Sequence, residues 1–143
     1  AGLVHRAGLV NVLVTNGTIG EAPWRALLPL LDAVNIDLKG FTEDWYRRLG
    51  GDLATVKRSI ALAAEACHLE VTTLVVPGEN DTEEEMRALS AWLASVDPDI
   101  PLHVSRFFPR HRMQDRSATP VRTVWRLAEV ARERLRFVYT GNC

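Results

Sequence analysis

Three polar residues alternate with apolar ones in the stretch DAVNIDLKGF, residues 32–41. Asn35, Asp37 and Lys39 would share one face of a strand, because successive side chains of a strand point to opposite faces. An amide, a carboxylate and an ammonium can together bind a charged or polar ligand, whereas burying a charge without a partner is costly. This face is therefore either solvated or part of a binding site. An ion pair between Asp37 and Lys39 without any ligand is the structural alternative.

Polar residues also follow the other apolar runs that are typical of strands. We expect strands over residues 9–15, 33–39, 69–76, 101–107 and 136–140. In parallel α/β folds, sites form at the carboxyl ends of the strands and in the loops after them. The candidate residues at these ends are Thr15, Asn16 and Gly17 after the first run and Asp37, Lys39 and Gly40 at the second. Residues 77–81, residues 105–111 with His111, and residues 140–142 follow the other three runs.

Each of these signals has a simpler interpretation. Asn16-Gly17 is a common turn signal, and residues 77–82 could be a turn followed by a helix start. A histidine in a loop, such as His111, is more often solvated than functional. His103 lies inside an expected strand and is interpreted as a satisfied core or edge histidine. The shared location of the polar residues favours a site, but no catalytic residue is identified.

Helical patterns separate the five runs. Their starts are marked by proline or by capping residues, namely Pro23, Asp52, Thr82 with Glu85, and Thr119 with Pro120 at the first helical position. Pro29 should end the first of these helices early. The four tryptophans lie at apolar spacing in helical stretches, and we expect them in the core.

Strands that alternate with helices predict βα units and a parallel sheet, either doubly wound or barrel-like. Five strands are too few for a complete eight-stranded barrel, which needs about 250 residues. We therefore predict an α/β fold that is a partial parallel (βα) barrel of about five βα units. Residues 1–143 contain no repeat and no linker, so they form part of one domain.

The composition narrows the function classes. A net charge of -1 argues against nucleic acid and anionic membrane as partners. No apolar run approaches the roughly 20 residues of a membrane span, and no signal peptide is visible, so a cytoplasmic location is expected. The two cysteines, Cys67 and Cys143, are too few for a disulfide framework or a cysteine-only metal site.

The order of the motifs resembles the radical SAM enzymes of the AmmeMemoRadiSam type, which are similar to the pyruvate formate-lyase activating enzyme. The motifs are VTNGTI, DAVNIDLKGF with WYRRLGG, LEVTTLVVPGENDTEEE, PLHVSRFFP, ATP and VYTGN. Together they cover essentially the whole chain. The resemblance implies a partial parallel barrel that binds S-adenosylmethionine and a [4Fe-4S] cluster. Reductive cleavage of the cofactor would then give methionine and a 5′-deoxyadenosyl radical.

The resemblance also implies roles for the candidate residues. The turn of Thr15, Asn16 and Gly17 would lie near the ribose and carboxylate of S-adenosylmethionine. Lys39 would offer its ammonium to the cofactor carboxylate or to a ribose hydroxyl, and Asp37 would balance the sulfonium or a bound cation. His111, two residues after Pro109, falls near a histidine that contacts the cofactor in the family.

The chain departs from the family at the cluster. The CxxxCxxC loop that holds the cluster and the GGEP-type segment are both missing, and the family places both before the TNG turn. The chain starts at Ala1 and stops at Cys143, directly after an expected strand. We therefore expect the C-terminal part of a radical SAM barrel domain, truncated at both ends and inactive alone. Its partner would be the missing N-terminal half of the same polypeptide. The sequence does not identify the substrate, which could be a protein.

Two other functions remain open. A cluster-free (βα) barrel lyase or aldolase would use Lys39 as a Schiff-base amine. Asp37, two residues earlier, argues against this because it would keep the amine protonated. A non-catalytic binding module that keeps the outline of the fold is the third possibility.

Overall fold

A computed structural model describes the backbone of residues 1–143 and every side chain except that of Arg112. The strands are β1 (Val12–Thr15), β2 (Ala33–Asp37), β3 (His68–Val75), β4 (Leu102–Arg106) and β5 (Val138–Gly141). The longer helices between them are α2 (Glu21–Leu27), α4 (Leu53–Ala64), α5 (Glu83–Val96) and α6 (Val121–Arg132). Short helices are α1 (Gly2–Arg6), η1 (Leu28–Leu30), α3 (Glu43–Arg48) and η2 (His111–Met113).

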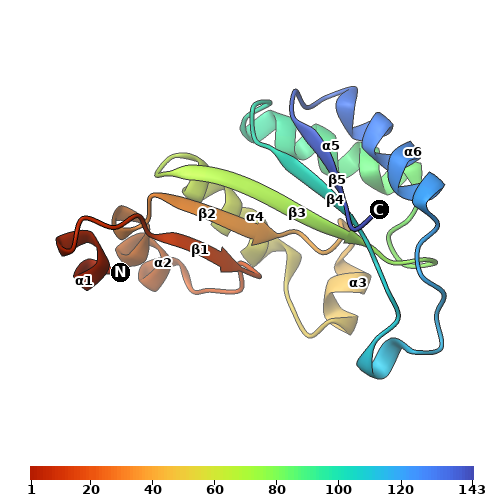
Figure 1. The fold of residues 1–143 in the computed structure, drawn as a ribbon, viewed down its shortest axis with the longest axis horizontal. Helices are drawn as coiled ribbons and strands as arrows, with labels where there is room; N and C mark the ends of the chain where they lie inside the picture. The colour runs from red at the N-terminus through yellow and green to blue at the C-terminus, as the bar shows by residue number, and fades with distance from the viewer.

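The five strands form one parallel sheet in the order β1-β2-β3-β4-β5. Each strand pairs with the next one along the chain, and every crossover from one strand to the next contains a helix. Parallel βαβ crossovers are right-handed, and here each new strand is added on the same side of the one before it. All crossover helices therefore lie on one face of the sheet. Figure 1 shows these helices behind the sheet, with its other face uncovered and α3 near the carboxyl ends of the strands. This arrangement confirms the partial (βα) barrel and excludes the doubly wound alternative, which requires a reversal of strand order.

The alternation in β2 divides the strand between the two faces of the sheet. Val34, Ile36 and Leu38 are 1%, 0% and 0% exposed and belong to the core between the sheet and the helices. The side chains of Asn35 and Asp37, and of Lys39 beyond the strand, are only partly buried. The prediction that these polar residues share one face is therefore confirmed.

Local capping signals predicted several element boundaries correctly. The Asp52 side chain accepts a hydrogen bond from Thr55 N at 2.7 Å and caps α4. The Thr82 hydroxyl likewise accepts from Glu85 N at 3.2 Å and caps α5. Helix α2 ends at Leu27, and η1, which contains Pro29, follows it, as a proline near the helix end requires.

Other expectations were wrong. Thr119 does not cap α6, because its hydroxyl donates to Val75 O at 2.6 Å and accepts from Phe107 N at 3.2 Å. Pro120 therefore takes the N-cap position. Trp125 is 57% exposed rather than in the core, since α6 packs through its opposite face, and the first strand begins at Val12 rather than at residue 9. Helix α3 was not predicted.

Among the residues that the structure describes, no helix combines the length and the apolarity that crossing a bilayer requires.

Candidate functional site

The ammonium of Lys39 and the carboxylate of Asp37 form an ion pair at the carboxyl end of β2. Lys39 Nζ lies 2.8 Å from Asp37 Oδ2, and the two side chains are 40% and 34% exposed. Half-exposed charges keep part of their hydration, so this pair contributes little to stability. It leaves hydrogen-bonding capacity on both groups, because an ammonium has three donors and a carboxylate about four acceptor sites. The pair can therefore bind a charged ligand without losing its internal contact.

The backbone of Lys39 is held by three side chains. Its N–H donates to the Tyr46 hydroxyl at 3.1 Å, and its carbonyl accepts from Trp45 Nε1 at 2.7 Å and from Asn80 Nδ2 at 2.9 Å. Burial raises the pKa of Tyr46 to about 12, so this phenol stays neutral at physiological pH. Gly40 leaves room for the Trp45 ring, because a Cβ at this position would lie 2.5 Å from Trp45 Cδ1. The lysine is thus fixed at its Cα while its ammonium remains accessible.

The turn of Thr15, Asn16 and Gly17 lies at the carboxyl end of β1, beside β2. The Thr15 hydroxyl accepts from Gly17 N at 3.2 Å, and Asn16 Oδ1 accepts from Thr18 N at 3.0 Å. Gly17 has φ +70°, and a Cβ there would approach Ile36 Cγ2 to 2.9 Å, so a side chain is excluded on both grounds. The turn interpretation of these residues is therefore correct, and it leaves the Asn16 side-chain amide N–H₂ group available to a ligand.

Two small cavities meet at Lys39. One has a volume of about 130 Å³ and places Asn16, Thr18 and Tyr46 around the lysine, together with Leu49, Gly50 and Gly51. The other has a volume of about 90 Å³ and is mainly apolar, lined beside Lys39 and Leu49 by Trp45, Leu74, Val76, Phe107 and Met113. Residues 49–51 follow α3, so this helix supplies one wall of the site. The site therefore combines charged, polar and apolar surface at the carboxyl ends of β1 to β4.

A buried carboxylate connects the segments around these cavities. The Glu79 side chain is 4% exposed and contacts the guanidinium groups of Arg48 in α3 and Arg116 in the loop before α6. Glu79 Oε1 accepts a hydrogen bond from Arg116, whereas Oε2 lies close to Arg48 without hydrogen-bond geometry. Arg116 also donates to Pro77 O at 3.0 Å. This charge cluster holds helix α3, the loop after β3 and the loop before α6 together at the same end of the sheet.

His111 lies at the start of η2 and is exposed. Its φ of 51° is in the left-handed region, which histidine adopts more readily than most residues. His111 is not among the residues that line the two cavities, whereas Met113, two positions later, lines the apolar one. The structure therefore gathers Asn16 and Lys39 around one cavity, with Asp37 paired to Lys39, and leaves His111 outside their lining.

A second polar group lies further down the uncovered face of the sheet. Glu70 accepts from His68 Nε2 at 3.2 Å and from His103 Nε2 at 2.7 Å, and the His103 ring stacks on Tyr139 at 5.5 Å between centroids. Hydrogen bonds from His68 and His103 lower the pKa of Glu70. His103 is thus a satisfied histidine, as predicted. The group as a whole was missed, although the spacing of His68 and Glu70 in one strand already places both on one face.

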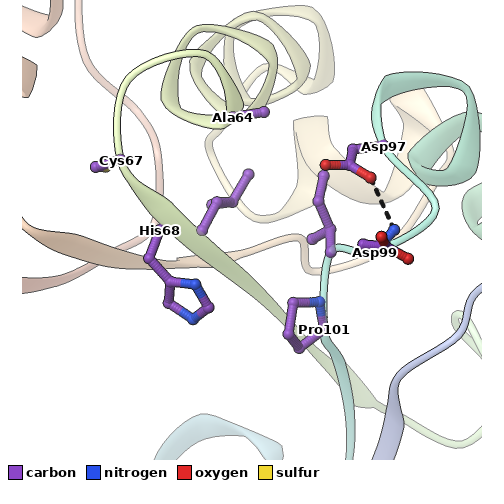
Figure 2. A pocket seen from close by; sticks show the side chains of 8 residues that line it. Ala64, Cys67, His68, Asp97, Asp99 and Pro101 are labelled. Carbon is purple, nitrogen blue, oxygen red and sulfur yellow. Dashed lines mark hydrogen bonds between the residues drawn. The ribbon is translucent and has the colours of Figure 1, made fainter.

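The opposite end of the sheet carries a cavity of about 220 Å³, shown in Figure 2. It gathers Cys67, His68, Asp97 and Asp99, but His68 points away from the two aspartates. Asp97 instead accepts from Asp99 N at 2.8 Å. Among the described residues, no three His, Cys, Asp or Glu side chains are arranged to hold a metal ion.

The cysteines do not suit an iron–sulfur cluster. Cys67 precedes β3 and Cys143 follows β5, so the two lie at opposite ends of the parallel sheet. Burial raises the pKa of the Cys67 thiol, which disfavours the thiolate that a metal would need. The residues of this chain therefore fit a polar, partly apolar ligand at Lys39, and they do not fit a [4Fe-4S] cluster.

Comparison with known proteins gives two relatives in sequence. The chain is 34% identical over 150 residues to the uncharacterized protein MJ0808 of Methanocaldococcus jannaschii, an alignment that covers 98% of this chain and 42% of the relative. It is 31% identical over 104 residues to the isethionate sulfite-lyase activating enzyme of Oleidesulfovibrio alaskensis, covering 67% of this chain and 32% of that enzyme. The chain thus spans less than half the length of both relatives. No protein-family model matches it.

Solved structures share the fold. A domain of a pyruvate-formate lyase-activating enzyme from Bacteroides vulgatus matches with a TM-score of 0.80 and 15% identity, covering 96% of this chain and 84% of that chain. TYW1 with a lysine-pyruvate adduct bound matches with a TM-score of 0.66 and 18% identity, covering 94% of this chain and 44% of that chain. The chain is therefore similar in sequence to one activating enzyme and has the fold of a domain from another.

Proposed function

We propose that this chain is part of a radical SAM enzyme of the activating type and that it supplies part of the binding site for S-adenosylmethionine. The observation that carries the proposal is the Asp37–Lys39 pair, which lies half-exposed at the carboxyl end of β2 beside two cavities. The similarity to an activating enzyme supports the reaction class. We assign the chain to the AmmeMemoRadiSam type within this class on the order of its sequence motifs.

The polar residues suit the amino-acid and ribose parts of the cofactor. S-adenosylmethionine bound here would supply radical chemistry, with the electron coming from a [4Fe-4S] cluster held by residues outside this chain. Lys39 would donate to the cofactor carboxylate or to a ribose hydroxyl. Asp37 would keep the ammonium in place and offset positive charge of the ligand. The side chain of Asn16, across the same cavity, would hydrogen-bond the ribose.

The apolar cavity suits the remaining part of the cofactor. Its lining combines Trp45, Val76, Phe107 and Met113 with the lysine at one end. An aromatic base fits such a surface, since apolar and sulfur-containing side chains pack well against ring faces and edges. The adenine would then lie next to the ribose subsite at Lys39. His111 would reach the ligand only through a change in the loop that contains η2.

The cluster requires residues that this chain does not contribute. We propose that its cysteine ligands come from the N-terminal half of the same polypeptide, and the greater length of both relatives is consistent with this. The second relative is named as an activator of a lyase, which favours a protein as the substrate of the radical. A cytoplasmic location is part of the same proposal.

The Schiff-base alternative for Lys39 is less well supported. One structural neighbour, TYW1, has a lysine-pyruvate adduct bound. Attack on a carbonyl, however, would require Lys39 Nζ to leave Asp37 Oδ2, which lies 2.8 Å away. The pair therefore favours ligand binding over covalent catalysis.

The proposal predicts that Lys39→Ala weakens the binding of S-adenosylmethionine. Loss of a hydrogen bond from a charged donor costs about 1.5–3 kcal/mol, which corresponds to an affinity about tenfold to hundredfold lower. Isothermal titration on the full-length, cluster-loaded protein measures this loss. Lys57, the only other lysine of the chain, provides a matched control. It lies over the Phe41 and Trp92 rings, so Lys57→Ala should leave the affinity unchanged.

Unchanged affinity in Lys39→Ala would contradict the proposal. It would show that the Asp37–Lys39 pair is only an ion pair at the mouth of the partial barrel.

A further inference from the structure

The backbone of Lys39 lies just beyond the regular pairing of β2 with β3. The register between these strands ends at Asp37 and Thr72, and Leu38 N donates the last hydrogen bond across to Thr72 O at 2.8 Å. The N–H and C=O groups of Lys39 therefore need partners other than a neighbouring strand.

The side chain of Asn80 donates the hydrogen bond that a neighbouring strand would otherwise donate to the Lys39 carbonyl. Its Nδ2 donates to Lys39 O at 2.9 Å and to Leu74 O at 3.0 Å, and its Oδ1 accepts from Val76 N at 2.7 Å. The residue is 5% exposed, and its bond from Val76 N is buried, whereas the bonds to Lys39 O and Leu74 O are partly buried. A neutral amide suits the position because it needs two donors on one side and an acceptor on the other. Asn80 thus fastens the end of β2 to the end of β3.

Asn80 is not among the residues that line the two cavities at Lys39. Any influence on a ligand in these cavities must therefore pass through a neighbour. Three hydrogen-bond partners of Asn80 line a cavity: Leu74 and Val76 line the apolar one, and Lys39 lines both. Lys39 is the partner whose side chain carries the charge that the ligand would meet. A shift of the lysine carbonyl would turn its Cα–Cβ bond and move the ammonium away from Asp37 and from the ligand.

We propose that Asn80 is a positioning residue for Lys39: its side-chain amide fixes the lysine backbone so that the ammonium points into the ligand site. This inference rests on the proposed function, because it assumes that Lys39 contacts the ligand. It adds a residue that acts on ligand affinity without touching the ligand.

A double-mutant cycle tests the inference in the full-length, cluster-loaded protein with S-adenosylmethionine as the probe. Asn80→Asp keeps the acceptor for Val76 N and replaces the two donors with an oxygen. We expect an affinity about three- to tenfold lower in the Lys39 background, within the usual range of coupling between neighbouring residues. In the Lys39→Ala background the same substitution should change the affinity by less than about twofold. A residue with only a structural role would lower the affinity equally in both backgrounds, or in neither.

Loss of stability is separated from loss of positioning by a second variant in the same loop. Thr82→Ala removes the cap of α5 and should lower the melting temperature, because such caps contribute about 1 kcal/mol. It should leave the affinity unchanged. If Asn80→Asp does not fold, Asn80→Ser, which is too short to reach Lys39 O, takes its place in the cycle.

The outcomes distinguish the two proposals. If Lys39→Ala lowers the affinity and the effect of Asn80→Asp is the same in both backgrounds, the positioning role is wrong and the proposed function stands. If Lys39→Ala leaves the affinity unchanged, the proposed function fails, and the positioning role fails with it.

Discussion

Among single residues, Glu85 is a half-buried carboxylate whose hydrogen-bond partner is a backbone group. Its Oε1 accepts from Phe41 N at 2.5 Å and thereby joins the loop after β2 to the first turn of α5. Burial raises the pKa of Glu85, and the hydrogen bond from Phe41 offsets this only in part. The folded state therefore disfavours ionisation of this group.

The sign of this shift predicts how Glu85→Gln changes stability with pH. Near pH 4 and below, Glu85 is mostly protonated in both the folded and the unfolded state. Burying this side chain then lowers the free energy of unfolding little. As the pH rises through the raised pKa, the folded state must ionise a half-buried carboxyl, and its contribution to stability is lost. Glutamine keeps an oxygen for Phe41 N and stays neutral. Melting temperatures should therefore favour Glu85→Gln over the wild type more at pH 7 than at pH 4.

The neighbouring Glu84 is exposed and serves as the control. Glu84→Gln, in the same first turn of α5, should shift the melting temperature less than Glu85→Gln does at pH 7, because its side chain is exposed. A difference between Glu85→Gln and the wild type that does not depend on pH would contradict the role assigned to burial.

At the scale of elements, the loop from β4 to α6 is closed by hydrogen bonds between its two ends. Thr119 is 0% exposed, and its backbone N donates to Phe107 O at 3.1 Å. Its hydroxyl bonds Val75 O and Phe107 N, and its carbonyl accepts from Arg106 Nε at 2.6 Å. Thr119 therefore anchors this loop to the ends of both β3 and β4, and the loop contributes Met113 to the apolar cavity.

We expect Thr119→Val to destabilise the protein, because valine has the same shape but cannot bond Val75 O or Phe107 N. Leaving buried polar groups without partners costs about 1–3 kcal/mol. Thermal or urea denaturation measures the loss. Thr119→Ser keeps the hydroxyl and should lose less stability than Thr119→Val. The opposite order would show that the methyl group, rather than the hydrogen bonds, holds the loop.

Local sequence signals predicted most helices and strands, whereas contacts between residues distant in the chain determined the roles that were not predicted. Asp52 and Thr82 cap their helices as predicted, since a cap depends on residues two or three positions away. Glu85 and Thr119 instead bond Phe41 and Val75, each 44 residues away in the chain. No local pattern contains those partners, so the uses of these two residues could not be predicted.

In the candidate site, too, local sequence patterns predicted some features, whereas others depend on contacts between distant residues. Alternation in β2 predicted the shared face of Asp37 and Lys39, because strand periodicity is a local property. The three side chains that hold the Lys39 backbone come from α3 and from the loop after β3. Their meeting depends on how α3 packs, and α3 was not predicted.

For the whole molecule, the two ends of the sheet differ in chemistry. The carboxyl ends carry Lys39, Asp37 and the two cavities, whereas the other end carries the cavity of Figure 2, in which the polar side chains do not converge. Cys67 and Cys143 lie at these two different ends. Iron–sulfur clusters are held by several cysteine thiolates close together, which the 143 residues of this sequence cannot provide.

We therefore predict that the 143-residue chain does not retain a [4Fe-4S] cluster. Anaerobic reconstitution with iron and sulfide, followed by iron analysis and absorption spectroscopy, tests this. A longer polypeptide that carries the proposed cysteine ligands, treated in the same way, is the positive control. Stoichiometric iron with a cluster absorption band in the 143-residue chain would overturn the prediction.

The alternation in β2 also separates two kinds of evolutionary constraint within one short strand. Val34, Ile36 and Leu38 are constrained by packing against the helices, so their replacement costs stability. Asn35, Asp37 and Lys39 lie outside this packing, so any constraint on them comes from what this face of the sheet binds. Because the same alternation recurs in β3, with buried Leu69, Val71, Thr73 and Val75, a new specificity can arise by changing every second strand position. Such a scaffold can acquire new substrates while its hydrophobic layer stays unchanged.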